Sequence, residues 1–99
     1  MRILAIVALI SACASPAPEM FGASRSEVSM DGIRFVVFHQ GDRAEVIRMG
    51  YLSRPDRARV PALMAAAAER ATGCRVRQGS VRTRLPGDTG EARMRLDCP

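Results

Sequence analysis

The clearest pattern in the chain is an alternation of apolar and polar residues on both sides of Asp31-Gly32. An Asp-Gly pair flanked by such alternation is the strongest short signal for a β-hairpin with a two-residue turn. We therefore expect Met30 to lie opposite Ile33. Val28 then lies opposite Phe35, and all four side chains share one face of a sheet.

A second turn is predicted at Gly41-Asp42-Arg43, after a strand that continues to His39. A three-residue loop places Val37 opposite Ile47 and makes one face uniformly apolar. The same register pairs Phe35 with Met49 and Ile33 with Tyr51. A two-residue loop would put Arg48 on that face, so the pattern favours three residues.

The middle strand of this meander is also apolar on its other face, through Val36 and Phe38. In one explanation, the segment before the first strand or the side chains of the edge strands cover them. In the other, they form an exposed apolar surface for a partner. Met20 and Phe21 lie in that preceding segment and could dock on the domain.

Residues 57–72 are predicted to form a helix. One face carries the apolar residues Val60, Leu63, Met64, Ala67 and Ala71, at the spacing of a helical stripe. Gly73 is suited to the C-cap. Pro61 belongs in the first turn, so the regular helix is expected to begin near Val60.

The C-terminal part reads as extended segments at 74–77, 81–85 and 92–98, with a turn at 86–90. Alternation points a set of apolar residues inward: Val76, Val81, Leu85, Met94 and Leu96. The inward residue is even-numbered at Val76 but odd-numbered at Val81, so a bulge or turn is expected near Gly79. The whole pattern predicts an α+β domain at 26–99, a small antiparallel sheet in the order ββ-β-α-ββ with one helix packed on one face.

Composition places limits on function. The chain has 99 residues, and although 47% are hydrophobic, ten of the first twelve are apolar. The remainder has a small, alanine-rich core, which excludes a multidomain enzyme and a polytopic membrane protein. A domain of this size is only marginally stable without a covalent or metal staple.

The first twelve residues read as an export signal, with Arg2 before a short apolar run that ends at Ile10. That run is too short to span a bilayer. Ile10-Ser11-Ala12-Cys13 resembles the lipobox of bacterial lipoproteins, with Ile where Leu is usual. The resemblance implies a lipid on Cys13, a flexible tether at 13–25 and a membrane-anchored location on the periplasmic side of the envelope. Ala14 in place of Asp implies the outer membrane.

Two alternatives to this anchor remain open. Ala12-Cys13-Ala14 also fits ordinary signal-peptidase cleavage after Ala14, which would release a soluble protein. The apolar run could instead be a buried N-terminal strand.

The three cysteines favour export. Lipidation or removal of Cys13 leaves Cys74 and Cys98, which can pair in an oxidising compartment. Such a bond closes a loop of about 25 residues and contributes about 3 kcal/mol in the chain-entropy account. Two buried free thiols are the alternative. No metal site is expected, because there is no C-x-x-C pair and His39 is the only imidazole.

All fifteen basic residues are arginines, against ten acidic residues, for a net charge of +5. Six decorate the predicted C-terminal hairpin: Arg75, Arg77, Arg82, Arg84, Arg93 and Arg95. They are a candidate surface for an anionic envelope component or an envelope protein. The bland explanation is a solvated sheet face in a chain of biased composition, which uses Arg where another would use Lys. Export and the lack of aromatic side chains among these arginines argue against nucleic acid.

No catalytic motif is present, and we expect no catalytic residues and no cofactor. His39 faces Glu45 in the predicted register, which is typical of a surface pair. The expected function is that of a small envelope lipoprotein with a binding or structural role. The alternative is a soluble periplasmic or secreted protein that binds a small ligand, or a minor enzyme, with a site near His39.

Overall fold

One α-helix packs against an antiparallel sheet of five strands in the computed structural model, which describes residues 18–50, 54–84 and 87–99. The elements are the 3₁₀ turn η2 (Pro18–Met20), β1 (Ser24–Met30), β2 (Ile33–Gln40), β3 (Arg43–Arg48), the 3₁₀ helix η3 (Arg54–Arg59), α1 (Val60–Thr72), β4 (Arg75–Val76) and β5 (Glu91–Asp97). The strand order in the sheet is β1-β2-β3-β5-β4. The predicted α+β fold, one helix on an antiparallel sheet, is confirmed.

The first hairpin has the predicted register. Met30 pairs with Ile33 and Val28 pairs with Phe35. Asp31 and Gly32 both have positive φ, 54° and 80°, as a two-residue type I′ turn requires. The Asp-Gly signal therefore determined the turn and the side-chain faces together.

The second hairpin differs from the prediction by one residue. Gln40 pairs with Arg43, so the loop contains only Gly41 and Asp42, and Val37 lies opposite Val46 rather than Ile47. The prediction assumed that apolar residues gather on one face. Because both faces of β2 are apolar and buried, alternation alone does not determine the register.

Arg48 therefore does lie opposite Phe35, on the face that packs against α1. Its position at the end of β3 makes this possible. Its Nε donates to the carbonyl of Thr89 at 2.9 Å, and a terminal nitrogen donates to the carbonyl of Gly50 at 2.7 Å. The guanidinium is thus hydrogen-bonded at the sheet margin and stays out of the core. Tyr51, which was predicted opposite Ile33, lies outside the described residues.

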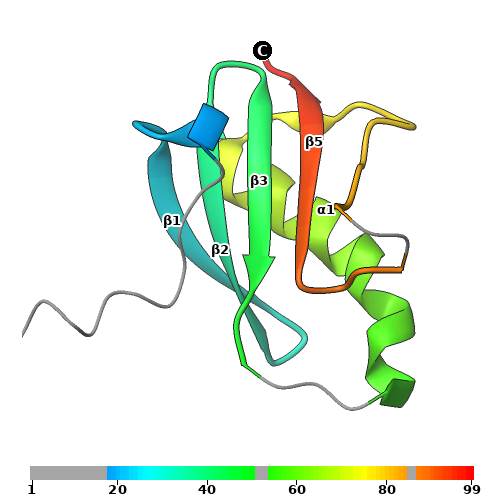
Figure 1. Ribbon diagram of the computed structural model, residues 1–99. Coiled ribbons are helices and arrows are strands. Elements are labelled where there is room, and N and C mark those ends of the chain that lie inside the picture. The colour runs from blue at the N-terminus through cyan, green and yellow to red at the C-terminus, as the bar shows by residue number, and fades with distance from the viewer. Residues whose placement is uncertain (1–17, 51–53, 85–86) are drawn as a thin grey trace, which may run out of the picture.

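The helix covers one face of the sheet (Figure 1). The regular helix begins at Val60, as predicted, but residues 54–59 form the 3₁₀ helix η3 rather than a first helical turn. Pro61 has no N–H to donate to the carbonyl of residue 57, which delays the α-helical hydrogen bonding. Gly73 caps the C-terminus, with its N–H donating to the carbonyl of Glu69 at 2.9 Å. The core under the helix contains Ile33, Phe35, Val37, Ala44, Val46, Val60, Met64, Ala67, Ala68, Cys74, Ala92, Met94 and Leu96.

The opposite face of the sheet has its own small core, which is visible where η2 lies in front of β2 in Figure 1. Met20 packs there against Val36 and Phe38, and these three side chains are 2%, 0% and 4% exposed. Val36 and Phe38 are therefore not an exposed partner surface, because Met20 covers them. The packed part of the chain begins at Pro18, so the tether predicted at 13–25 is shorter than expected at its C-terminal end.

The C-terminal region is less regular than predicted. The turn expected near Gly79 is present, but beyond it the described part of segment 81–84 makes only one bridge, between Arg82 and Arg93. The hydroxyl of Ser80 accepts the backbone N–H of Arg95 at 3.1 Å, in place of a strand partner. Val76 and Val81 are partly buried against the core, as their inward orientation predicted. Leu85 lies outside the described residues.

Cys74 and Cys98 form a disulfide, as predicted. The bond joins the residue after the helix C-cap to the residue after β5. It therefore fastens the helix to the sheet at the end of the domain where the chain terminates.

Candidate anion-binding surface

The face of the sheet opposite α1 carries an unusual pairing of like charges. Arg43 on β3 lies directly opposite Arg95 on β5, and Arg93 lies opposite Arg82 in the single bridge. Arg93 and Arg95 are two residues apart on one strand, so all four side chains share this face. Like charges at directly opposed positions destabilise a sheet. The fold therefore places four arginines at adjoining positions, at some cost to the sheet.

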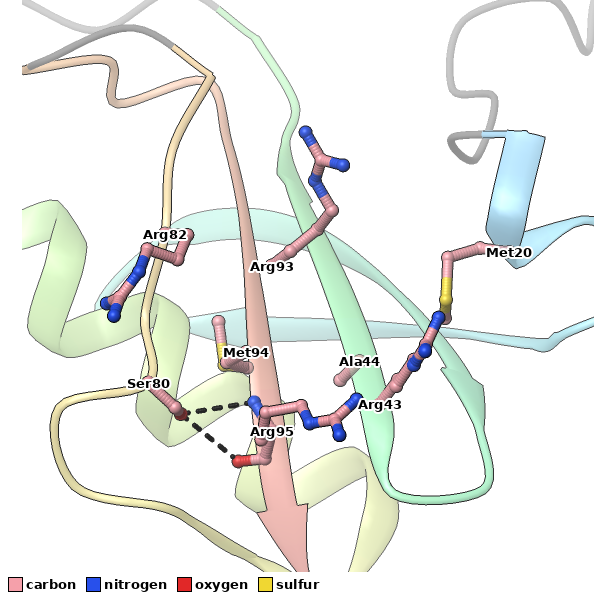
Figure 2. A pocket seen from close by; sticks show the side chains of 8 residues that line it. All are labelled: Met20, Arg43, Ala44, Ser80, Arg82, Arg93, Met94 and Arg95. Carbon is pink, nitrogen blue, oxygen red and sulfur yellow. Dashed lines mark hydrogen bonds between the residues drawn. The ribbon is translucent and has the colours of Figure 1, made fainter.

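These four arginines, Arg43, Arg82, Arg93 and Arg95, are called the arginine surface below. They surround a hollow of about 200 Å³, which is also lined by Met20, Ala44, Ser80 and Met94. Figure 2 shows Arg95 extending from β5 towards Arg43 on β3, while Arg43 reaches towards Met20. The two hydrogen bonds of Ser80 with the backbone of Arg95 fix the position of that residue.

Two carboxylates lie further along the same strand pair. Glu45 lies opposite Arg93, and Glu91 lies opposite Ile47, so both acids share the face of the arginine surface. Glu45 is only 2% exposed. Burial, together with the neighbouring Glu45 carboxyl, raises the pKa of Glu91 to about 7. Arg93 opposes this shift through a 3.1 Å contact from its Nε to a Glu91 carboxylate oxygen.

The charges on this face are thus divided into two zones. Glu45 and Glu91 offset the charge of Arg93 at the buried end. At the open end, the one carboxylate paired with Arg95 among the described residues is that of Asp42, at 3.8 Å and exposed to solvent. The Arg43 guanidinium has no hydrogen bond or ion pair with the described residues. Arg43 and Arg95 therefore carry the least compensated charge of the surface.

The remaining predicted arginines do not join this group. Arg77 donates to the Asp97 carboxylate at 2.8 Å, and this hydrogen bond and the charge of Asp97 raise the pKa of Arg77. Arg75 is exposed on the edge strand β4, and Arg84 is exposed beyond the hollow. The structure thus brings together three of the six arginines predicted on the C-terminal hairpin and adds Arg43. Arg82 is held by hydrogen bonds to the carbonyls of Gly79 and Val81.

Arg43 was missed because its place depends on the register of the second hairpin. The predicted three-residue loop left Arg43 inside the turn, where it has no strand partner. With the two-residue loop it becomes the first residue of β3 and faces Arg95. Recognition that Val36 and Ile47 belong to a second buried face would have revealed this register.

His39 lies on the other side of the sheet and faces Ala44, not Glu45 as predicted, because of the same one-residue shift. Its Nε2 is 2.9 Å from the carbonyl oxygen of Gly41. The His39 ring and the sulfurs of Cys74 and Cys98 lie within 4.8 Å of one another. While the sulfurs are joined in a disulfide they offer no thiolate to a metal, so the cluster as folded is not a zinc site.

The predicted lipidation site, Cys13, lies outside the described residues. Within the part of the chain that the structure describes, no helix has the length and apolar character needed to cross a membrane. Comparison with known proteins finds no matching family model, no similar curated protein and no similar solved structure. Proposals about function therefore depend on the residues themselves.

Proposed function

We propose that this chain is a small envelope lipoprotein whose arginine surface binds a phosphate-bearing, anionic component of the cell envelope. The lipobox-like motif that ends at Cys13 supports the anchor, and the disulfide is in keeping with an oxidising compartment. The proposed role is binding, with no catalytic step.

The observation that carries the proposal is the pair of opposed arginines, Arg43 and Arg95. Their repulsion has little compensation within the described residues, so an anion placed between them would remove a cost that the folded protein already bears. Guanidinium groups are well suited to this role because they present planar sets of N–H donors to phosphate oxygens.

The proposal is tested by the binding of soluble polyphosphate to the mature chain, measured by titration calorimetry at low salt. The double variant Arg43→Gln/Arg95→Gln is expected to bind about 10- to 30-fold more weakly, at about 1 kcal/mol for each arginine. Affinity of the unaltered chain should fall steeply as salt is added.

The matched control is Arg57→Gln/Arg70→Gln, which removes the same charge from exposed positions in η3 and α1. It is expected to change the affinity by about twofold or less, as screened charges at a distance do. Equal losses in the two double variants would show that only net charge matters, and the proposed site would be rejected. So would the absence of binding by the unaltered chain.

The anchor has its own test. The intact mass of protein from the membrane fraction should show a chain that begins at Cys13 and carries two or three acyl groups, at two mass units below the reduced form. A chain that begins at Ser15 would replace the lipoprotein with a soluble one.

A further inference from the structure

We infer that the partner of this surface is the membrane that holds the anchor: Phe21 enters the headgroup region while Arg43 and Arg95 contact the phosphates of anionic lipids. The inference rests on the proposed lipidation of Cys13 and names the ligand of the proposed binding surface.

The short connection between anchor and domain is the first argument. Only four residues, Ala14 to Ala17, separate Cys13 from Pro18, where the packed part of the chain begins. Even fully extended, that stretch reaches about 18 Å. A lipid on Cys13 would therefore hold the Pro18 end of the domain close to the bilayer surface.

Phe21 is the second argument. It is 65% exposed and is the only large hydrophobic side chain that is exposed in the described part of the chain. Its neighbour Met20 is buried, so the local backbone is held against the sheet. The N–H groups of Phe21 and Ala23 also donate to the carbonyls of Pro18 and Met20, at 3.3 and 3.0 Å. A fixed, outward-facing aromatic three residues into the packed domain is suited to the membrane interface.

Phe21 follows Met20, which lines the hollow together with the least compensated arginines, Arg43 and Arg95. A Cβ at Gly22 would lie 4.0 Å from the side-chain nitrogen of Gln40, so this turn contacts the end of β2. Gln40 pairs with Arg43, and Arg43 pairs with Arg95. An apolar side chain and two cations thus lie at the same end of the sheet, in the combination that binds anionic lipid surfaces.

The position of the helix agrees with this orientation. η2 packs on the face of the sheet opposite α1, so the docked domain would direct α1 away from the bilayer. Glu91 lies at the far end of the β3–β5 pair from Arg43 and Arg95, and Glu45, which is nearer, lies opposite Arg93.

A single tryptophan provides the test, because the chain contains none. The lipidated Phe21→Trp variant is reconstituted by its own anchor into vesicles of phosphatidylcholine, with or without phosphatidylglycerol. With phosphatidylglycerol, the emission maximum should move to shorter wavelength and quenching by iodide should fall. Adding Arg43→Gln/Arg95→Gln should remove most of both changes.

The matched control is Ala62→Trp, at an exposed position of α1. Its emission should be the same in both vesicles, because the helix faces away from the bilayer. A shift in the Ala62→Trp control, or no shift in the Phe21→Trp variant, overturns the inference. A shift in the Phe21→Trp variant that survives loss of both arginines also overturns it, since the phosphate contacts would then play no part.

These results separate the two proposals. If polyphosphate binding depends on Arg43 and Arg95 while the tryptophan of the Phe21→Trp variant stays in water, the surface binds anions but does not dock on the membrane. If polyphosphate is not bound, the anion-binding function fails whatever that tryptophan does.

Discussion

Glu91 is a half-buried acid that lies close to Glu45, on the same face as four arginines. Glu91 has a pKa near 7, because burial and its neighbour Glu45 both disfavour its charged form. Protonation of Glu91 removes the repulsion between the two neighbouring carboxylates.

This shift predicts a pH-dependent stability. Between about pH 4.5 and 7 the folded state holds a proton on Glu91 that the unfolded state has released, so the free energy of unfolding should decrease as pH rises. Glu91→Gln should remove this decrease and stabilise the protein at pH 8, by about 1 kcal/mol after allowance for screening by solvent and Arg93. Urea unfolding at pH 5 and pH 8 measures both effects.

The exposed Glu27, which pairs with Arg25 at the surface, provides the comparison. Glu27→Gln should leave the pH profile close to that of the unaltered chain. The free energy of unfolding of the unaltered protein is compared with that of Glu91→Gln at each pH. If the unaltered protein gains stability over the variant between pH 5 and 7, the pKa of Glu91 is not raised.

At the scale of elements, the 3₁₀ turn η2 explains why β2 can be apolar on both faces. A sheet with one helix leaves its other face open to water, and Val36 and Phe38 would be exposed there. Met20 closes that face, together with the partly buried Ala23, Ile47 and Met49. The preceding segment therefore acts as part of the core rather than as a tether alone.

Met20→Ala is accordingly expected to destabilise the domain by about 2 kcal/mol, because it removes a buried side chain and opens a cavity over β2. Phe21→Ala, one residue along but 65% exposed, should change stability by no more than about 0.5 kcal/mol. Guanidinium unfolding of the two variants gives the comparison. Equal effects at both positions would mean that η2 does not pack on the sheet as described.

For the molecule as a whole, the disulfide closes a domain with a small core. The core under α1 includes four alanines, which bury little area each. Cys74 and Cys98 are 24 positions apart, so the bond restricts a quarter of the chain in the unfolded state.

The double variant Cys74→Ser/Cys98→Ser should lose about 3 kcal/mol of unfolding free energy, a large share of the total available to a domain of this size. Reduction of the unaltered chain should produce a similar loss, and the doubly substituted chain should be insensitive to reductant. A loss below about 1 kcal/mol would show that the core alone holds the fold.

The sequence by itself determined the fold class, the first hairpin, the start and cap of α1 and the pairing of Cys74 with Cys98. Each rests on simple chemistry: a turn that needs positive φ, a proline that lacks an N–H, or an odd number of cysteines of which one is lipidated or removed. Such signals act over a few residues or through covalent bonding, so they can be read without the rest of the molecule.

Only the tertiary structure decided the register of the second hairpin, the burial of Val36 and Phe38, and the grouping of Arg43 with Arg82, Arg93 and Arg95. These depend on what covers the second face of the sheet. Alternation assigns residues to two faces but does not say whether both are buried. Met20 covers the second face, and Ile47 packs there as well. The observed register therefore differs by one residue from the predicted one, and it places Arg43 opposite Arg95.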